Sequence, residues 1–178
     1  MNVKNSTLDS RFDLFFKKFT NLLMKDGKKI KAAKILFDML VILKKRIKKD
    51  LEKKNQSLVT NSNSKIKILE PVNFELLRLI SQAFENVTPS LEVRKVRVAG
   101  STYLVPAVLS KKKQENLALK WLIESTKKRQ KNSKLNFSIC LADELFDASK
   151  KLGQTRQKRD ELHRLAQMNR AYIRYRWW

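Results

Sequence analysis

Basic and aromatic side chains are interspersed at the end of the 178-residue chain. From Lys150 to Trp178 there are nine Lys and Arg residues, against two acids, Asp160 and Glu161. The arginines cannot all lie on one face of an ideal helix, so the segment is basic around much of its girth. This pattern is typical of a segment embedded among phosphates, where each neutralised phosphate releases a counterion and makes binding steeply salt-dependent.

The aromatic residues of this segment add planar faces beside the charges. They are Tyr172, Tyr175, Trp177 and Trp178, and arginines alternate with them. Such rings stack on unpaired bases, which RNA offers in loops and junctions rather than in regular duplex. The pattern therefore favours irregular RNA as the ligand. The alternative is that the rings dock onto the protein's own core.

A second basic stretch, "SLEVRKVRVAGSTYLVPAVL", alternates β-branched residues with basic or small ones. The alternation predicts a β-hairpin over residues 92–108, with "AGST" as its turn. Pro106 is compatible with it because a two-stranded arm has only edge strands. Arg94, Lys95 and Arg97 line one strand, so the hairpin is interpreted as a basic arm. The alternative is a cap over a helical core.

The remaining reactive side chains give little support for catalysis or metal binding. The one histidine, His163, has no nearby acid or nucleophile, and a general base needs a positioned partner. We expect it to be packed, hydrogen-bonded structurally or in contact with RNA. The single cysteine, Cys140, lies in an apolar run and is interpreted as a core residue. One cysteine and one histidine do not form a typical structural zinc site, so we predict no catalytic residue, metal or cofactor.

The composition points to a folded domain with a basic surface. Lys and Arg number 40 against 17 acids, which gives a net charge of +23, while 42% of the residues are hydrophobic. Such an excess indicates an anionic partner, either a nucleic acid or a membrane surface, although a merely solvated surface is the plain alternative. No apolar run is long enough to span a bilayer. The first residues, "MNVKNSTLDSRFD", resemble neither a secretory signal nor a transit peptide.

Apolar spacing predicts the helices that would carry these segments. The first covers about residues 11–25, with Ser10 as N-cap and Gly27 as its stop. The third follows Pro71 and turns Phe74 inward. The other helices are expected over about residues 29–48, 113–129, 135–151 and 155–172. We predict a single, mainly α domain over residues 1–178: a bundle of about six helices with one protruding β-hairpin arm, a flexible basic insertion at 48–69, and a basic aromatic C-terminal segment at 154–178.

Four stretches of the chain resemble the ribosomal protein seven family of the small ribosomal subunit. They are "FTNLLMKDGKKIKAAKIL", "AFENVTPSLEVRKVRVAGSTYLVP", "NLALKWLIESTKKR" and "LADELFDASKKLGQTRQKRDELHRLAQMNRAYIRYRWW". The resemblance runs from about Phe12 to the C-terminus and is interrupted mainly by Lys44–Leu69. The doubled terminal tryptophan and "VAGSTY" are most similar to the mitochondrial branch, which implies a mitochondrial location.

The resemblance implies a non-catalytic protein that binds the 3′ major domain of small-subunit rRNA and nucleates assembly of the subunit head. It also implies a hairpin near the exit-site tRNA and the mRNA exit path, with neighbouring ribosomal proteins as further partners and no membrane. The tip that faces tRNA and mRNA would be Ala99, Gly100, Ser101 and Thr102. The residues expected to contact RNA, from the resemblance or from their own chemistry, are Lys28, Lys29, Arg94, Lys95, Arg97, Lys111, Lys112, Lys113, Arg156, Lys158, Arg159, Arg164, Arg170, Arg174, Arg176, Trp177 and Trp178.

Two departures from the family pattern accompany this expectation. About ten weakly charged residues precede the first expected helix, where relatives carry a longer basic arm, and the Lys44–Leu69 connection is longer and more basic than usual. The rival hypotheses are an organellar DNA-binding or packaging protein and a peripheral membrane protein that uses the Phe-rich first helix. A nuclease is a more distant rival, because no clustered acids are available to hold metal.

Overall fold

The computed structural model describes residues 3–58 and 69–178 and confirms a mainly α fold with one β-hairpin. Helices precede the hairpin, and further helices follow it. In chain order the elements are α1 (Val3–Leu23), α2 (Lys29–Leu58), α3 (Leu69–Val87), β1 (Leu91–Val98), β2 (Ser101–Val108), α4 (Lys111–Ser133), α5 (Phe137–Ser149), α6 (Gln154–Met168) and the 3₁₀ helix η1 (Arg170–Tyr175).

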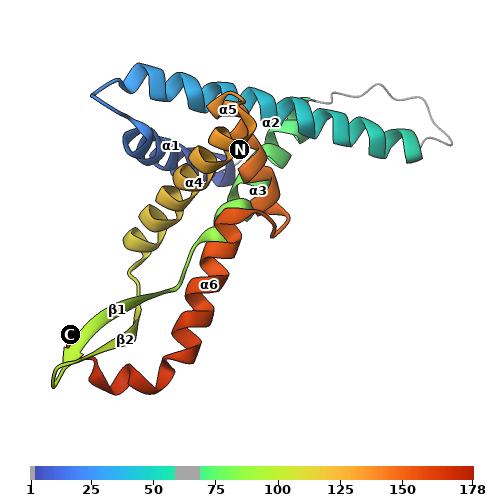
Figure 1. The fold of residues 1–178 in the computed structure, drawn as a ribbon. Coiled ribbons are helices and arrows are strands. Elements are labelled where there is room, and N and C mark those ends of the chain that lie inside the picture. Colours follow the sequence, from blue (N-terminus) through green and yellow to red (C-terminus); the bar gives the residue numbers. More distant parts are fainter. Residues whose placement is uncertain (1–2, 59–68) are drawn as a thin grey trace.

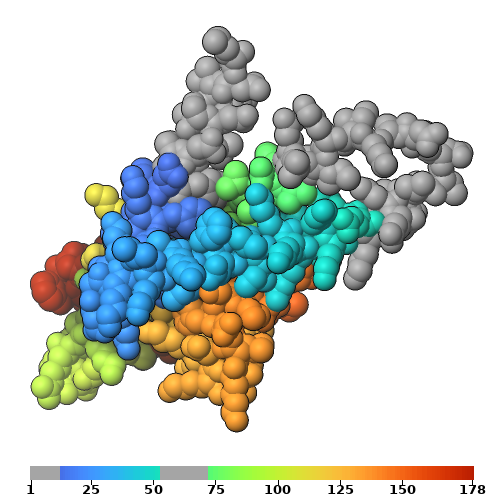
Figure 2. All heavy atoms as spheres, turned by 90° about the horizontal axis from the view of Figure 1, so that it is seen from above, coloured from blue at the N-terminus to red at the C-terminus, as the bar shows by residue number. Residues whose placement is uncertain are grey.

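The helices α1 to α5 form one body, from which the hairpin and α6 extend on the same side (Figure 1). α6 runs alongside the hairpin and contacts both strands, and η1 turns back to contact β2. Seen from above, the hairpin and the C-terminal residues emerge at the same end of the molecule (Figure 2). We call the hairpin, α6 and the residues that follow it (91–108 and 154–178) the composite arm.

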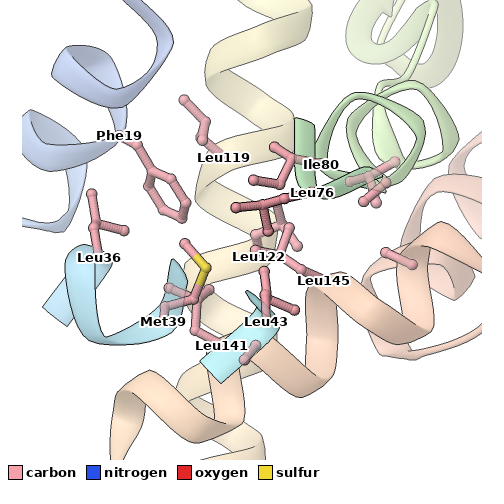
Figure 3. Packing of buried hydrophobic residues seen from close by; sticks show 14 of the residues in the cluster. Phe19, Leu36, Met39, Leu43, Leu76, Ile80, Leu119, Leu122, Leu141 and Leu145 are labelled. Carbon is pink, nitrogen blue, oxygen red and sulfur yellow. The ribbon is translucent and has the colours of Figure 1, made fainter. Parts of the chain in front are cut away.

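The core lies where α1 to α5 meet (Figure 3). Phe19 of α1, Leu43 of α2 and Leu122 of α4 are among its fully buried side chains, and Figure 3 shows them converging with leucines of α3 and α5. Each helix contributes one apolar stripe, as the helical period requires. Cys140 is fully buried in α5, which confirms its interpretation as a core residue.

The hairpin closes through the two-residue turn Ala99–Gly100, since Val98 pairs with Ser101. Both turn residues have positive φ, 47° and 84°, the combination of a type I′ turn, whose twist matches the strands. The predicted four-residue tip is therefore wrong in one detail: Ser101 and Thr102 belong to β2. Pro106 lies opposite Val93, and β2 has no partner but β1 among the described residues.

The first two helices extend well beyond their predicted bounds. α1 begins at Val3, so Ser10 lies inside the helix rather than at its N-cap, and most of the residues expected to precede the first helix belong to it. α2 continues to Leu58 because no Gly or Pro interrupts it and Leu43, Ile47 and Leu51 prolong its apolar stripe. The first part of the predicted flexible insertion is therefore helical, and its residues 59–68 lie outside the described part.

The predicted position of Phe74 is wrong, because its side chain is 63% exposed. The buried stripe of α3 runs through Leu76, Ile80, Ala83 and Val87. A residue two positions before Leu76 lies about 200° away around the helix, on the solvent side.

The last helix ends at Met168, earlier than predicted. The side-chain amide of Asn169 donates a hydrogen bond to the carbonyl oxygen of Leu165 at 2.8 Å. The backbone carbonyl oxygen of Asn169 accepts a hydrogen bond from the N–H of Tyr172 at 3.0 Å. Asparagine competes in this way with helical hydrogen bonds and favours helix ends. The chain tightens into η1 and turns toward β2.

Candidate nucleic-acid interface

The two faces of the hairpin have different surroundings. Register places Val96 opposite Tyr103 and Lys95 opposite Leu104. Because side chains alternate along a strand, Arg94 shares the face of Val96 and Tyr103, while Lys95 and Arg97 share the other face. The first face packs against α6 and η1. The three cations predicted as one set are thus divided: Lys95 and Arg97 are exposed, whereas Arg94 is partly buried.

Three tyrosines join the C-terminal turn to the hairpin. The ring centroid of Tyr103 lies 5.0 Å from that of Tyr172 and 4.9 Å from that of Tyr175, and the last two are 6.1 Å apart. These are favourable distances for aromatic pairs. For Tyr172 and Tyr175 the structure therefore favours docking onto the protein over stacking on bases, although the surface they meet is the hairpin rather than the core.

The terminal tryptophans reach β1. The Arg94 guanidinium lies 5.1 Å from the ring centroid of Trp178 and 2.5 Å from Glu92 Oε1. Trp177 stands edge-on to Trp178, with centroids 5.7 Å apart, and is 82% exposed. A groove of about 350 Å³ separates these rings from the strand, and it is lined by Arg94, Lys95, Val96, Arg97, Trp177 and Trp178.

Two of the predicted RNA-contacting residues of α6 have hydrogen-bond partners within the protein, and a third is partly buried. Arg156 donates to the carbonyl oxygen of Asn86 at 2.8 Å and to Asp160 at 2.9 Å, and Lys158 donates to Glu124 at 2.8 Å. Arg159 is partly buried, and its Nε has no hydrogen-bond partner within the described part of the chain. Burial, followed by the charge of Arg156, lowers the pKa of Arg159. The hydrogen bonds of Arg156 and Lys158 give these two residues a structural role.

The other predicted basic residues of the C-terminal segment point outward. None of them forms a salt bridge with an acidic side chain in residues 3–58 or 69–178, and all are exposed: Arg164, Arg170, Arg174 and Arg176. Together with Lys95 and Arg97 they make up the exposed charge of the composite arm. Exposed cations without an acidic partner are available to phosphates.

Two further groups of predicted lysines mark helix N-termini. Lys28 and Lys29 lie at the start of α2, and Lys111, Lys112 and Lys113 form the first turn of α4; all are exposed. Ser110 precedes α4 and makes no side-chain capping hydrogen bond. Cations in a first turn oppose the helix dipole, but free N–H groups and lysines together attract an anion. The start of α4 is thus suited to phosphate, whereas at α2 the N–H groups of Lys28 and Lys29 already donate to backbone carbonyl oxygens and only the lysine side chains are available.

His163 has a structural contact, in agreement with its interpretation. Its Nε2 accepts the N–H of Ser90 at 3.4 Å, which connects α6 to the start of the hairpin. Burial first, and then the charge of Arg159, lowers the pKa of His163, so the ring is a neutral acceptor at pH 7. Among the described residues, no three His, Cys, Asp or Glu side chains come together to hold a metal ion, and no helix is long and apolar enough to cross a membrane.

Tyr103 is the residue of the interface that the sequence analysis missed. Its place in the strict alternation with Val105 and Ala107 was visible in the sequence. That alternation identifies the covered face of the strand but not the segment that covers it. The covering residues, Tyr172 and Tyr175, lie about 70 positions later and have no local signal of the contact.

Comparison with known proteins identifies the family. The family described as ribosomal protein S7p/S5e matches residues 2–170. A small ribosomal subunit protein uS7m of Prototheca wickerhamii is 46% identical over 90% of this chain and 88% of its own length. Another uS7m, of Marchantia polymorpha, is 45% identical over 58% of this chain and 46% of its own length. A small ribosomal subunit protein uS7 of Colwellia psychrerythraea is 36% identical over 90% of this chain and 85% of its own length. The chain therefore belongs to the ribosomal protein S7p/S5e family.

Proposed function

We propose that this protein binds the 3′ major domain of small-subunit rRNA, nucleates assembly of the subunit head, and holds its hairpin near the exit-site tRNA and the mRNA exit path. Family membership makes it a structural protein of the mitochondrial small ribosomal subunit and not an enzyme. The proposal adds which RNA it binds and which surfaces make the contact.

The observation that carries the proposal is the composite arm with its outward cations. Tyr103, Tyr172 and Tyr175 fasten the hairpin to the C-terminal turn, and the exposed Lys95 and Arg97 lie on the opposite face of the strand. The arm therefore presents charge at fixed positions rather than on a free tail. Fixed cations favour an RNA of matching shape over any polyanion.

The helix N-termini extend the same interface. Lys111, Lys112 and Lys113 come directly after the hairpin, and Lys28 and Lys29 begin α2. Two separate basic clusters in addition to the arm suit an rRNA junction, whose phosphates approach from several directions. A regular DNA duplex would present its phosphates along one axis only.

A salt titration tests the proposal. The full chain is offered a refolded 3′ major-domain rRNA fragment and a DNA duplex of similar charge. Between low and moderate salt, six to ten phosphate contacts weaken binding to either ligand by roughly three to five powers of ten. We expect the rRNA fragment to remain bound at moderate salt after the DNA is released. Equal release of both would make the protein a general polyanion binder, as the DNA-packaging hypothesis requires.

Paired charge variants locate the contact. We expect the double variant Lys95→Ala with Arg97→Ala to lower the salt slope for the rRNA fragment by about 2, one for each lost phosphate contact. The matched control is Lys127→Ala with Lys128→Ala, which removes the same charge from exposed positions in the C-terminal half of α4. Equal effects of the two double variants would show that net charge, not the arm, determines affinity.

A further inference from the structure

The groove between β1 and the last two residues combines aromatic and cationic groups with little acid. Six residues line its volume of about 350 Å³, and three of them, Arg94, Lys95 and Arg97, are cations. The nearest acid on the strand, Glu92, is already paired with Arg94 at 2.5 Å. Four consecutive residues of β1, Arg94 to Arg97, line one side of the groove. Its net charge therefore favours an anionic occupant.

The two tryptophans have different roles in this groove. Trp178 is partly buried and lies against the Arg94 guanidinium, with 5.1 Å between the guanidinium carbon and the ring centroid. Because Glu92 neutralises and orients Arg94, this contact fixes the wall of the groove. Trp177 is 82% exposed, and its one aromatic contact among the described residues is the edge-on contact with Trp178. An indole face is thus open to solvent and free to stack on a ligand.

We propose that this groove binds an unpaired RNA nucleotide, whose base stacks on Trp177 and whose flanking phosphates pair with Lys95 and Arg97. The proposal rests on the proposed function, in that the chain binds RNA, and it defines one site within that interface. Every base offers a π-face, so stacking on Trp177 would tolerate any sequence. A volume of about 350 Å³ lies in the range of small-molecule pockets. An acidic peptide would match the charge but would leave the indole without a stacking partner.

The test measures binding of fluorescein-labelled hexauridylate to the full chain by fluorescence anisotropy. We expect Trp177→Ala to weaken binding by about 5- to 150-fold, the range that corresponds to 1–3 kcal/mol for one stacked base. Trp177→Phe should restore most of the affinity because it keeps an aromatic face. The matched control is Trp121→Phe on α4, a half-buried tryptophan outside the groove. Equal affinity of Trp177→Ala and the wild type would overturn the proposal.

A second measurement separates stacking from charge attraction. In a chain with Trp121→Phe, Trp177 and Trp178 are the only tryptophans, and a base stacked on Trp177 quenches their fluorescence. We expect hexauridylate to quench this emission and polyglutamate not to. If polyglutamate quenches equally, the groove recognises negative charge alone and the nucleotide assignment is wrong. Circular dichroism checks that each variant retains its helices.

The rRNA fragment shows where the nucleotide comes from. If Trp177→Ala weakens binding of both the 3′ major-domain fragment and hexauridylate, the rRNA itself supplies the nucleotide. If Trp177→Ala weakens only hexauridylate binding, the nucleotide belongs to a single-stranded RNA other than the rRNA fragment. Both results support the proposed site. Failure of the wild type to prefer the rRNA fragment over DNA would instead refute the proposed function. That result is independent of the Trp177 comparison.

Discussion

Glu144 of α5 is expected to be the most sensitive single position for the attachment of the composite arm. Its side chain is 1% exposed and accepts two hydrogen bonds from Thr155, the N–H at 2.9 Å and the hydroxyl at 2.6 Å. Arg129 lies 3.5 Å from its other oxygen. Burial alone would lower the pKa of Arg129, but the hydrogen bond to Asp147 and the neighbouring carboxylates raise it. Glu144 thus joins α4, α5 and the start of α6.

The substitution Glu144→Ala should destabilise the protein by about 3–5 kcal/mol. Hydrogen bonds to a charged group contribute roughly 1.5–3 kcal/mol each, and breaking a buried ion pair costs about 3–5 kcal/mol. Because the same carboxylate makes these contacts, their energies are not added. For a chain of this length about 1 kcal/mol shifts Tm by roughly 2–4 °C, so the expected fall is about 6–20 °C.

Thermal and urea unfolding followed by circular dichroism measure this effect. Glu144→Gln keeps an acceptor for Thr155 and should cost less, about 1.5–3 kcal/mol, the value of one lost charge-assisted contact. The control Glu161→Ala removes the same charge from an exposed position and should stay within about 0.5 kcal/mol. If Glu144→Ala costs no more than Glu161→Ala, the buried network does not hold α6, and the reasoning is wrong.

Two other predictions concern the same region. Gly153 has φ +91°, and an added Cβ would lie 3.2 Å from Asp147 Cβ and from Glu144 Oε1, so Gly153→Ala should cost about 1–3 kcal/mol in the same unfolding assay; no loss would show that the turn adjusts freely. In an NMR titration of this single histidine, the pKa of His163 should lie below the ordinary value of about 6.5. Because the folded-state pKa is lowered, the stability of the protein should fall as the pH drops below about 6.5 and should level off below the folded-state pKa. A normal or raised pKa would contradict the burial of His163 beside Arg159.

Local patterns were sufficient to predict most of the architecture. The hairpin follows from strict alternation around a turn, and each helix follows from one apolar stripe. The errors concern two things: which side of a helix a residue lies on, and the residue at which a helix ends. Phe74 was assigned to the wrong side of α3, since a stripe with several apolar neighbours has no unique phase until the other helices are placed. Asn169 ends α6 because its side chain donates a hydrogen bond to a helical carbonyl oxygen. The residues around Asn169 contain no other pattern that would predict this helix end.

The candidate site was predictable in composition but not in arrangement. Charge excess correctly identified which segments are basic. It could not separate Arg156 and Lys158, which have internal partners, from Arg164 and Arg170, which are exposed without acidic partners in the described chain. Those partners, Asn86 and Glu124, are distant in sequence, so only the folded chain brings them together.

Some cations have partners within the protein and others are exposed without acidic partners in the described chain. This division explains how so basic a protein can present a defined surface. With a net charge of +23, exposed cations on a loose arm would repel one another and spread apart. The composite arm is instead held at its base and joined within itself: Arg156 and Thr155 attach its base to α3 and α5, and Tyr103 joins its hairpin to η1. The cations with internal partners provide rigidity, which reduces the entropy lost when the remaining cations meet phosphate. Removing an internal contact should therefore weaken RNA binding without removing any contact to the RNA.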